Sequence, residues 1–280
     1  MEARIPARII HIYSAPVDQP EELPLFNRAA LANSRLLHPN FDHVFFGRRE
    51  MEDFLTKEFP QFRDVMASFP QPIQRFDFFR YLAVYRLGGF YFDLDVFLAK
   101  SLKPLLNYEC IFAFEELTIS NFLRQRFSLD WELANYGFGA APGNPFLAAV
   151  IGNCIRGLHE PAWAQRMLQD IPRLFRAPFV APFTTGPGAV SRTFAENPEL
   201  RRNVTVLFPG NVCNQTTWHQ FGDFGVHLMQ SSWRKKEGLL RRRAARWWEN
   251  FRRSRQVRLS NRLGPARSGE WRSLFPAPPT

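Results

Sequence analysis

An α/β fold is predicted by the sequence, because candidate strands and helices alternate along the 280-residue chain. The opening carries the first observation: two strand-like runs, Ala7–Tyr13 and Asp42–Phe46, flank a stretch with helical periodicity, Glu21–Leu37. The second observation is the segment Ile73–Leu87, which is apolar on almost every helical face and so predicts a buried helix. The third is the aromatic run Phe90–Phe92 directly after it, which predicts a buried strand.

The remaining elements continue this alternation. The glycine pair Gly88 and Gly89 predicts the end of the buried helix, since glycine is favoured just after a helical C-terminus. Beyond the aromatic strand we expect an apolar segment, a helix, a loop-rich section and a short strand, in the order Cys110–Phe114, Pro145–Leu158, Thr184–Arg192 and Val204–Phe208.

One main domain, residues 1–233, is expected, followed by a basic tail, residues 234–280. With 45% apolar residues the chain can bury a substantial core. It has no run of the roughly 18 consecutive apolar residues that a membrane span requires, and its first apolar stretch is too short for a signal peptide. We therefore expect a cytoplasmic protein. The three cysteines lie far apart and lack zinc-ligand spacing, which indicates reduced thiols.

The tail carries all of the excess positive charge. The formal net charge of the chain is +10, yet Trp233–Thr280 contains 14 Lys and Arg against 3 Asp and Glu. The remaining residues are close to neutral, with 22 basic and 23 acidic side chains. The pI of about 10.1 therefore describes the tail and says little about the ligand of the main domain.

A helix through the tail would carry one apolar stripe. Three interpretations of this helix differ in what the helix would bind. A stripe surrounded by arginines favours peripheral attachment to an anionic surface such as the inner face of the plasma membrane. Alternatively, an amphipathic helix packs on the main domain. Interleaved Arg and Trp are also found in nucleic-acid-binding proteins, but the one-sided stripe makes nucleic acid the less favoured partner. The stripe comprises Leu240, Ala244, Trp247, Trp248 and Phe251.

Two carboxylates, Asp93 and Asp95, stand at the end of the predicted strand Phe90–Phe92. Ligands of open α/β sheets bind outside the carboxyl ends of strands, and a spacing of two lets both side chains reach one ligand where the backbone leaves the strand. Hard oxygen ligands suit Mg²⁺ or Mn²⁺, with diphosphate oxygens completing the coordination shell. The alternative is a pair of solvated loop aspartates that cap the next segment.

A second charged pair, Asp77 and Arg80, lies on the predicted buried helix. At a spacing of three residues the two side chains can form an ion pair worth a few tenths of a kcal/mol. Buried charges need more partners than each other, however, and a polyol or phosphate ligand would supply them.

The haloacid-dehalogenase phosphatases also combine an apolar strand with D-x-D. They require Thr or Val where this chain has Phe97, so this class is not favoured.

The run RFDFFRYLAVYRLGGFYFDLDVFL resembles the sugar-binding DXD region of glycosyltransferase family 32, which includes capsular-polysaccharide transferases and initiating mannosyltransferases and is more distantly similar to the clostridial glucosylating toxins. The family pattern is S-D-x-x-R-Y, an apolar stretch, and G-G-x-Y-x-D-x-D. Phe76 replaces the serine, and the matching residues are Asp77, Arg80, Tyr81, Gly88, Gly89, Tyr91, Asp93 and Asp95. Weaker likenesses at IPARIIHIY, NYGFGAAPGNPF, TTGPGAV and VHLMQSSW extend the resemblance over roughly residues 5–233. It implies a GT-A-type, Rossmann-like nucleotide-sugar-binding domain.

Carried over to this sequence, the resemblance implies a set of roles around a sugar donor and a metal. Asp95 would bind Mn²⁺ or Mg²⁺ directly, and Asp93 would contact both the metal and the ribose. Asp77 and Arg80 would hold hydroxyls of the donor sugar and phosphate. Asn135 would approach the donor sugar.

The same resemblance implies contacts to the nucleotide from other parts of the chain. Tyr91 would pack near the nucleotide, and Tyr13 or Ser14 would lie beside the base. Ser231 and Trp233 would donate to the β-phosphate.

Three residues have competing interpretations. His227 opens the closing element of the family and is a candidate metal ligand, although a histidine on an apolar strand is also commonly a satisfied structural group. Gly186 and Gly188 predict either a phosphate-binding loop or plain turn residues.

The resemblance therefore implies a metal-dependent, retaining hexosyltransferase. Its donor would be a nucleotide-sugar, with a UDP-sugar favoured and a GDP-sugar as the alternative. The acceptor is expected to be a glycan or lipid-linked precursor in bacterial surface-polysaccharide biosynthesis, with a protein acceptor left open. Same-face attack assisted by the leaving phosphate oxygen is favoured over double displacement. The alternative function is a basic nucleic-acid-binding protein with a non-catalytic α/β domain.

Overall fold

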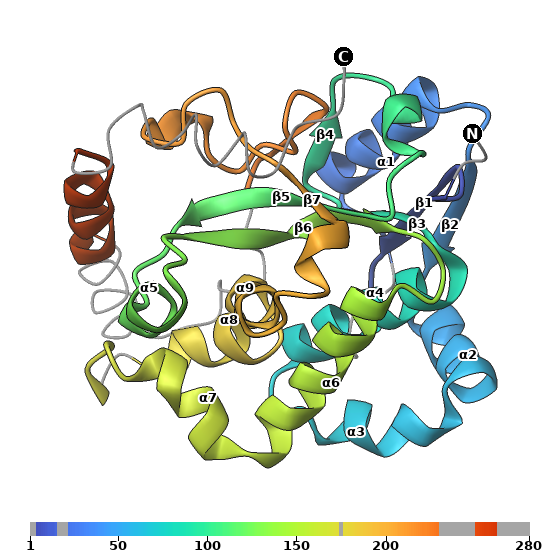
Figure 1. Ribbon diagram of the computed structural model, residues 1–280. Coiled ribbons are helices and arrows are strands. Elements are labelled where there is room, and N and C mark those ends of the chain that lie inside the picture. Colours follow the sequence, from blue (N-terminus) through green and yellow to red (C-terminus); the bar gives the residue numbers. More distant parts are fainter. Residues whose placement is uncertain (1–3, 16–21, 174–175, 230–249, 262–280) are drawn as a thin grey trace.

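A six-stranded mixed sheet organises the chain in the computed structural model, which describes residues 4–15, 22–173, 176–229 and 250–261 (Figure 1). Neighbouring strands run parallel except around β6, which is antiparallel to both β3 and β5. The carboxyl ends of the other five strands consequently lie at one edge of the sheet. The order across the sheet is β2 (Asp42–Phe46), β1 (Arg8–Ile12), β3 (Gly89–Phe92), β6 (Trp131–Ala140), β5 (Cys110–Leu117) and β7 (Val204–Leu207).

One face of this sheet is covered by helices, which lie below it in Figure 1. Side chains that point to this face, such as Tyr91, Phe112 and Phe138, belong to the larger of two apolar clusters. The helices of this layer are α2 (Arg48–Glu58), α3 (Arg63–Ser68), α4 (Pro72–Leu87), α5 (Asn121–Phe127), α6 (Pro145–His159), α7 (Pro161–Leu168), α8 (Val180–Thr184) and α9 (Pro187–Glu196). The α/β class predicted from the sequence is confirmed by this layered arrangement.

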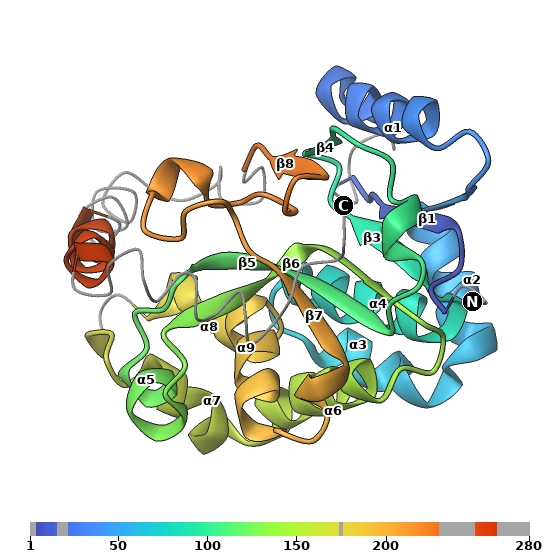
Figure 2. The same cartoon turned by 45° about the horizontal axis from the view of Figure 1, so that its top comes forward.

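The opposite face carries α1 (Leu25–Leu37) and a two-stranded ribbon in which β4 (Val96–Leu98) pairs antiparallel with β8 (Gly225–His227) (Figure 2). Asn33 of α1 holds this ribbon, because its side chain both accepts from the Leu98 amide at 2.7 Å and donates to the Leu98 carbonyl at 3.1 Å. Phe90 and Phe92 point to this face and pack in the smaller cluster. Single turns of 3₁₀ helix connect the main elements at Pro60–Phe62, Lys103–Leu105, Ala177–Phe179, Arg201–Asn203 and Gln215–Thr217.

Helix α4 begins and ends where the sequence signals it should. Gln71 and Gln74 cap its first turn reciprocally, and Pro72 occupies the first helical position, where its missing amide has no partner to lose. Gly88 follows the last turn with φ of +64°, a conformation that glycine adopts readily. The predicted helix Ile73–Leu87 is therefore confirmed and lies with nine of its residues buried, Asp77 and Arg80 among them.

The section Thr184–Arg192, expected to be loop-rich, is largely helical, so this expectation is wrong. Helix α9 starts at Pro187, with Gly186 as its N-terminal cap. Glycine and proline at these two positions are helix-start residues as well as turn residues. The same two residues therefore fit a turn and a helix start. The helix forms here because the apolar residues that follow pack in the core.

The described part of the tail, residues 250–261, is a helix that packs on the main domain (Figure 1). Gln256 is 1% exposed and donates to the Leu117 carbonyl at 2.9 Å, while Arg252 pairs with Glu116 at 2.6 Å. Arg255 donates to the Asn121 side chain at 2.9 Å. For these residues the packed-helix interpretation is favoured, and two arginines are engaged by the domain.

The rest of the apolar stripe, Leu240, Ala244, Trp247 and Trp248, lies outside the described residues, so membrane attachment stays a prediction. Within the described ranges, no helix combines the length and the apolar character needed to span a bilayer.

A buried carboxyl group, Glu132, lies in β6 close to the packed tail helix. Its side chain is 4% exposed and accepts a hydrogen bond from the Thr118 hydroxyl. Burial raises the pKa of Glu132 to about 8, and the neighbouring Glu116 carboxylate adds to this rise. The folded protein therefore holds a proton here that the unfolded chain releases near pH 4.5.

We expect Glu132→Gln to flatten the pH dependence of stability. Because the folded-state pKa of Glu132 is raised, its contribution to stability is fully present below about pH 4.5 and is lost as pH rises through about 8. In that window the free energy of unfolding should fall by up to about 1.4 kcal/mol per pH unit in the wild type. Urea unfolding at a series of pH values measures this fall in the free energy of unfolding. The control is Glu160→Gln, which removes an exposed partner of Arg156 and should leave the slope of unfolding free energy against pH unchanged. Parallel plots of unfolding free energy against pH for wild type and Glu132→Gln would contradict the expectation.

Candidate active site

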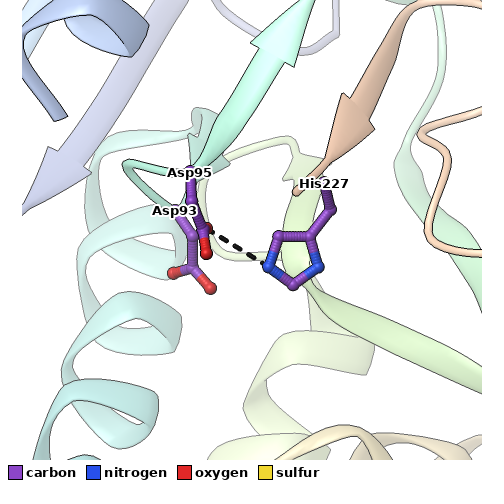
Figure 3. A group of neighbouring side chains, drawn as sticks. All are labelled: Asp93, Asp95 and His227. Atoms are coloured by element: carbon purple, nitrogen blue, oxygen red, sulfur yellow. Dashed lines mark ion pairs between the residues drawn. The ribbon is translucent and has the colours of Figure 1, made fainter. Parts of the chain in front are cut away.

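Asp93, Asp95 and His227 converge above the carboxyl end of β3 (Figure 3). The backbone leaves β3 through a turn closed by a hydrogen bond from the Val96 amide to the Asp93 carbonyl at 3.1 Å. Pairing of β4 with β8 sets Val96 opposite His227, and this brings the imidazole Nε2 to 3.2 Å from Asp95 Oδ1. Ligand atoms from all three residues lie within 4.8 Å of one another.

This donor set fits a divalent cation. Two carboxylates and one imidazole are ligands that Mn²⁺ accepts, and the carboxylates suit Mg²⁺ as well. The side chain of Asp93 is 27% exposed, which leaves room on the solvent side for ligands that the protein does not supply. His227 thus lies within reach of any cation that both carboxylates bind, and of its two interpretations the arrangement favours the ligand.

Arg80 connects α4 to this group from the helical side of the sheet. Its guanidinium lies 3.2 Å from Asp93 and 3.2 Å from Asp77, and it donates to the Asn135 carbonyl at 2.9 Å. The same group stacks over the Tyr91 ring at 4.8 Å from its centroid. With its side chain 5% exposed, Arg80 is a buried cation held by two carboxylates.

Asp77 is the buried end of this network. Besides Arg80, it accepts hydrogen bonds from the Asn135 amide at 2.9 Å and from the Thr185 hydroxyl at 2.9 Å. Burial raises the pKa of Asp77 to about 6, although Arg80 and the two hydrogen bonds oppose the rise. Tyr81 completes the network by accepting from Asn135 and donating to the Thr185 carbonyl at 2.7 Å.

Burial also sets the electrostatics around Asp93. It raises the pKa of Asp93, an effect that the Arg80 charge opposes. For Arg80, burial would lower the pKa, but the Asp93 and Asp77 carboxylates outweigh it and hold the pKa raised, so the cation is permanent. Burial raises the pKa of Tyr91 as well, and its protonated hydroxyl donates to Asp93. Asp93 is therefore oriented by two groups before any ligand arrives.

The other residues expected around the donor lie near the three converging side chains or fall outside the described residues. Tyr13 and Ser14 follow β1 at the same sheet edge as Asp93, and the Tyr13 hydroxyl donates to the Glu22 carbonyl. Gly186 adjoins Thr185 of the Asp77 network. Ser231 and Trp233 lie outside the described residues.

Gly188 is buried inside α9, where it packs against Phe183. A Cβ atom built on Gly188 would meet a ring carbon of Phe183 at 2.1 Å. The close approach of α9 to α8 therefore requires glycine at this position, whether or not phosphate is also bound nearby.

We expect Gly188→Ala to destabilise the fold by about 1–3 kcal/mol, because overpacking forces Phe183 or the helix to move. Gly152→Ala in α6 is the matched control, since a Cβ atom there meets nothing within 4 Å. Alanine has the higher helix propensity, so the control should be neutral or stabilised by up to about 1 kcal/mol. Urea unfolding compares the two; equal stability of Gly188→Ala and wild type would contradict the packing role.

Comparison with known proteins places the motif in a family region. Residues 28–112 match the family described as glycosyltransferase sugar-binding region containing DXD motif. Over 120 residues the chain is 33% identical to inositol phosphoceramide mannosyltransferase 3 of Schizosaccharomyces pombe, covering 43% of this chain and 30% of the relative. Over 115 residues it is 30% identical to a mannosyl phosphorylinositol ceramide synthase of Saccharomyces cerevisiae, covering 41% and 27%. The chain thus spans about a third or less of the length of these two relatives.

Among solved structures, similar chains include the PaToxG glycosyltransferase, with 10% identity, a TM-score of 0.46 and coverage of 69% of this chain and 70% of that one. The UDP-bound glycosyltransferase domain of the YGT toxin has 9% identity and a TM-score of 0.42, with coverage of 73% and 80%.

The mixed α/β sheet carries the D-x-D motif at the end of β3, where the sequence analysis expected it. More particularly, residues 28–112 match the DXD-containing sugar-binding region of glycosyltransferases, and the resemblance predicted from the sequence is confirmed for this region.

Proposed function

We propose that the chain is a metal-dependent glycosyltransferase that moves mannose from a nucleotide-sugar donor to a hydroxyl acceptor with retention of configuration. The observation that carries this proposal is the convergence of Asp93, Asp95 and His227 over the buried Arg80–Asp77 pair, within and beside the matched sugar-binding region. Mannose is chosen because both curated relatives are named for mannosyl transfer.

In this function Asp93, Asp95 and His227 would hold Mn²⁺ or Mg²⁺ against the donor diphosphate. The bound cation would neutralise negative charge on the leaving nucleoside diphosphate. Arg80 fixes the Asp93 carboxylate, because it is already engaged with Asp77, Asp93 and the Asn135 carbonyl. Its principal role is therefore to orient a metal ligand, and contact with the donor comes second.

The acceptor is proposed to be the hydroxyl of a polyol or sugar on a lipid. The names of the curated relatives point to inositol phosphoceramide as their acceptor. A lipid-linked precursor of a surface glycan, the expectation from the sequence, has the same chemistry at the attacking hydroxyl. Either acceptor would be compatible with action in the cytoplasm at a membrane surface.

Calorimetric titration tests the proposal. UDP, GDP and their hexose conjugates would be titrated into the protein with Mn²⁺ and with a chelator, followed by donor hydrolysis for each sugar. We expect one nucleotide to bind at least about tenfold more tightly with Mn²⁺ than with chelator, because the chelator removes a charge-assisted contact to the diphosphate. Equal affinity in chelator for every donor that is hydrolysed would contradict metal dependence, and absence of binding and hydrolysis for the whole panel would contradict the function.

A further inference from the structure

A group of buried polar atoms lies beside His227 and is not explained by the metal site. Glu115 of β5, Tyr136 of β6 and His219 of the segment before β8 form it. His219 Nδ1 lies 3.6 Å from Glu115 Oε1, and the His219 and His227 rings have centroids 6.2 Å apart. The Tyr136 ring stacks on His227 at 4.2 Å. The cluster is therefore continuous with the metal ligand and lies on the ribbon side of the sheet.

Four atoms of this cluster lack hydrogen-bond partners among the described residues. They are Glu115 Oε2, the Tyr136 hydroxyl, His219 Nδ1 and His227 Nδ1. Tyr136 is 2% exposed, so its hydroxyl is withdrawn from solvent. Buried polar groups in native proteins are almost always paired, and several unpaired ones in one place indicate that a ligand or ordered water pairs them.

The chemistry of the cluster defines which ligand fits. Burial would raise the pKa of Glu115, but the neighbouring His219, His227 and Arg252 side chains together outweigh it and lower the pKa, so this group is a carboxylate that accepts hydrogen bonds. The Tyr136 hydroxyl is a phenol, which is protonated at neutral pH and can donate a hydrogen bond. The Glu115 carboxylate repels a phosphate at this point. A neutral ring with neighbouring hydroxyls both donates and accepts, and so satisfies this set.

Side chains of the cluster are partly exposed, although their unpaired atoms are covered. The side chains of Glu115 and His219 are each 17% exposed, and that of His227 is 14% exposed. A hydroxyl-bearing ring can therefore approach Glu115 from the solvent side, next to the metal ligands.

We propose that Glu115, Tyr136 and His219 form the acceptor subsite, which binds the ring hydroxyls of a cyclitol or sugar next to the metal-bound donor. This inference rests on the proposed function and adds the residues that bind its second substrate. Glu115 accepts from one hydroxyl of the ring, and Tyr136 donates to a neighbouring oxygen.

Two conservative variants test the subsite. Tyr136→Phe removes only the unpaired hydroxyl and keeps the ring that stacks on His227, while Glu115→Gln keeps the shape and removes the charge. Tyr85→Phe in α4, away from the cluster, is the matched control. Binding of myo-inositol and of methyl α-mannoside would be measured by titration into protein saturated with Mn²⁺ and the nucleoside diphosphate that binds best.

We expect each cluster variant to weaken polyol binding about tenfold or more, since each loses one hydrogen bond in a desolvated site. Metal-dependent nucleotide binding should be weakened less than polyol binding, because the three metal ligands are retained. The melting temperature of Tyr136→Phe should equal or exceed that of wild type, because an unpaired buried hydroxyl is removed. Tyr85→Phe should behave as wild type in every measurement.

The outcomes separate this inference from the proposed function. If nucleotide binds with metal but neither polyol binds wild type, or if both cluster variants bind polyol as wild type does, the subsite is wrong and the transferase proposal stands. If a polyol binds while no nucleotide does, the transferase proposal is wrong.

Discussion

Asp95→Asn is expected to abolish sugar transfer while the protein keeps its fold. Asparagine retains the shape of the side chain but removes the charge that faces His227 at 3.2 Å and the proposed cation. Changes to groups that merely orient metal ligands cost about 10- to 100-fold, so loss of a direct carboxylate ligand should lower turnover by at least about 100-fold. Donor turnover at saturating Mn²⁺ and the melting temperature together measure the effect.

The control for this variant is Asp53→Asn. Asp53 lies on α2 in an exposed i, i+4 pair with Arg49, and its loss should change neither turnover nor melting. An Asp95→Asn protein that melts normally and turns over at the wild-type rate would remove Asp95 from the site.

Arg80→Met is expected to be among the most destabilising single changes in the domain. It leaves Asp77, 4% exposed, without the cation that compensates its burial, and breaking a buried ion pair in this way typically costs about 3–5 kcal/mol. Transfer should fall as well, because Asp93 loses the guanidinium that orients it. Urea unfolding gives the stability, and turnover is then measured under conditions where the variant is folded.

Arg86→Met on the same helix is the matched control. Arg86 pairs with Glu58 at the surface with 57% of its side chain exposed, so its removal should cost less than about 1 kcal/mol. The double variant Asp77→Asn/Arg80→Met should be more stable than Arg80→Met alone, since the uncompensated charge is gone. Equal losses for the two arginine variants would show that Arg80 is not the buried partner of Asp77.

Much of the fold was predictable where local signals agree. The structure confirms strands β1 and β2, which their apolar pattern predicted, and the unit from α4 to β3, which an apolar pattern and a glycine stop predicted. Strand β6 was not predicted, because Gly137 and Gly139 interrupt its apolar pattern. These glycines make sense only in the sheet, where each lies opposite an aromatic residue of β3 that fills its missing side chain.

The candidate site was predictable to the extent that a motif carried it. Asp77, Arg80, Asp93, Asp95, Asn135 and His227 do come together, as the resemblance implied. Thr185 was not assigned a role, although it lay in the segment TTGPGAV, because its bond to Asp77 joins residues 108 positions apart. Glu115 and His219 carry no local signal at all, since only the folded sheet edge brings them beside His227.

The pairing of β4 with β8 joins the two halves of the proposed cation site through very little structure. Strand β8 has three residues, and Val226 and Leu228 are 38% and 49% exposed, so little apolar burial opposes its local opening. A cation held by Asp95 and His227 must be released before the ribbon opens, and binding therefore protects the ribbon by mass action. The amides of His227 and Leu228, which donate to the His219 and Asp95 carbonyls, should accordingly exchange with deuterium more slowly when Mg²⁺ is added. Their exchange rates would report occupancy of the site even before a donor or an acceptor is known.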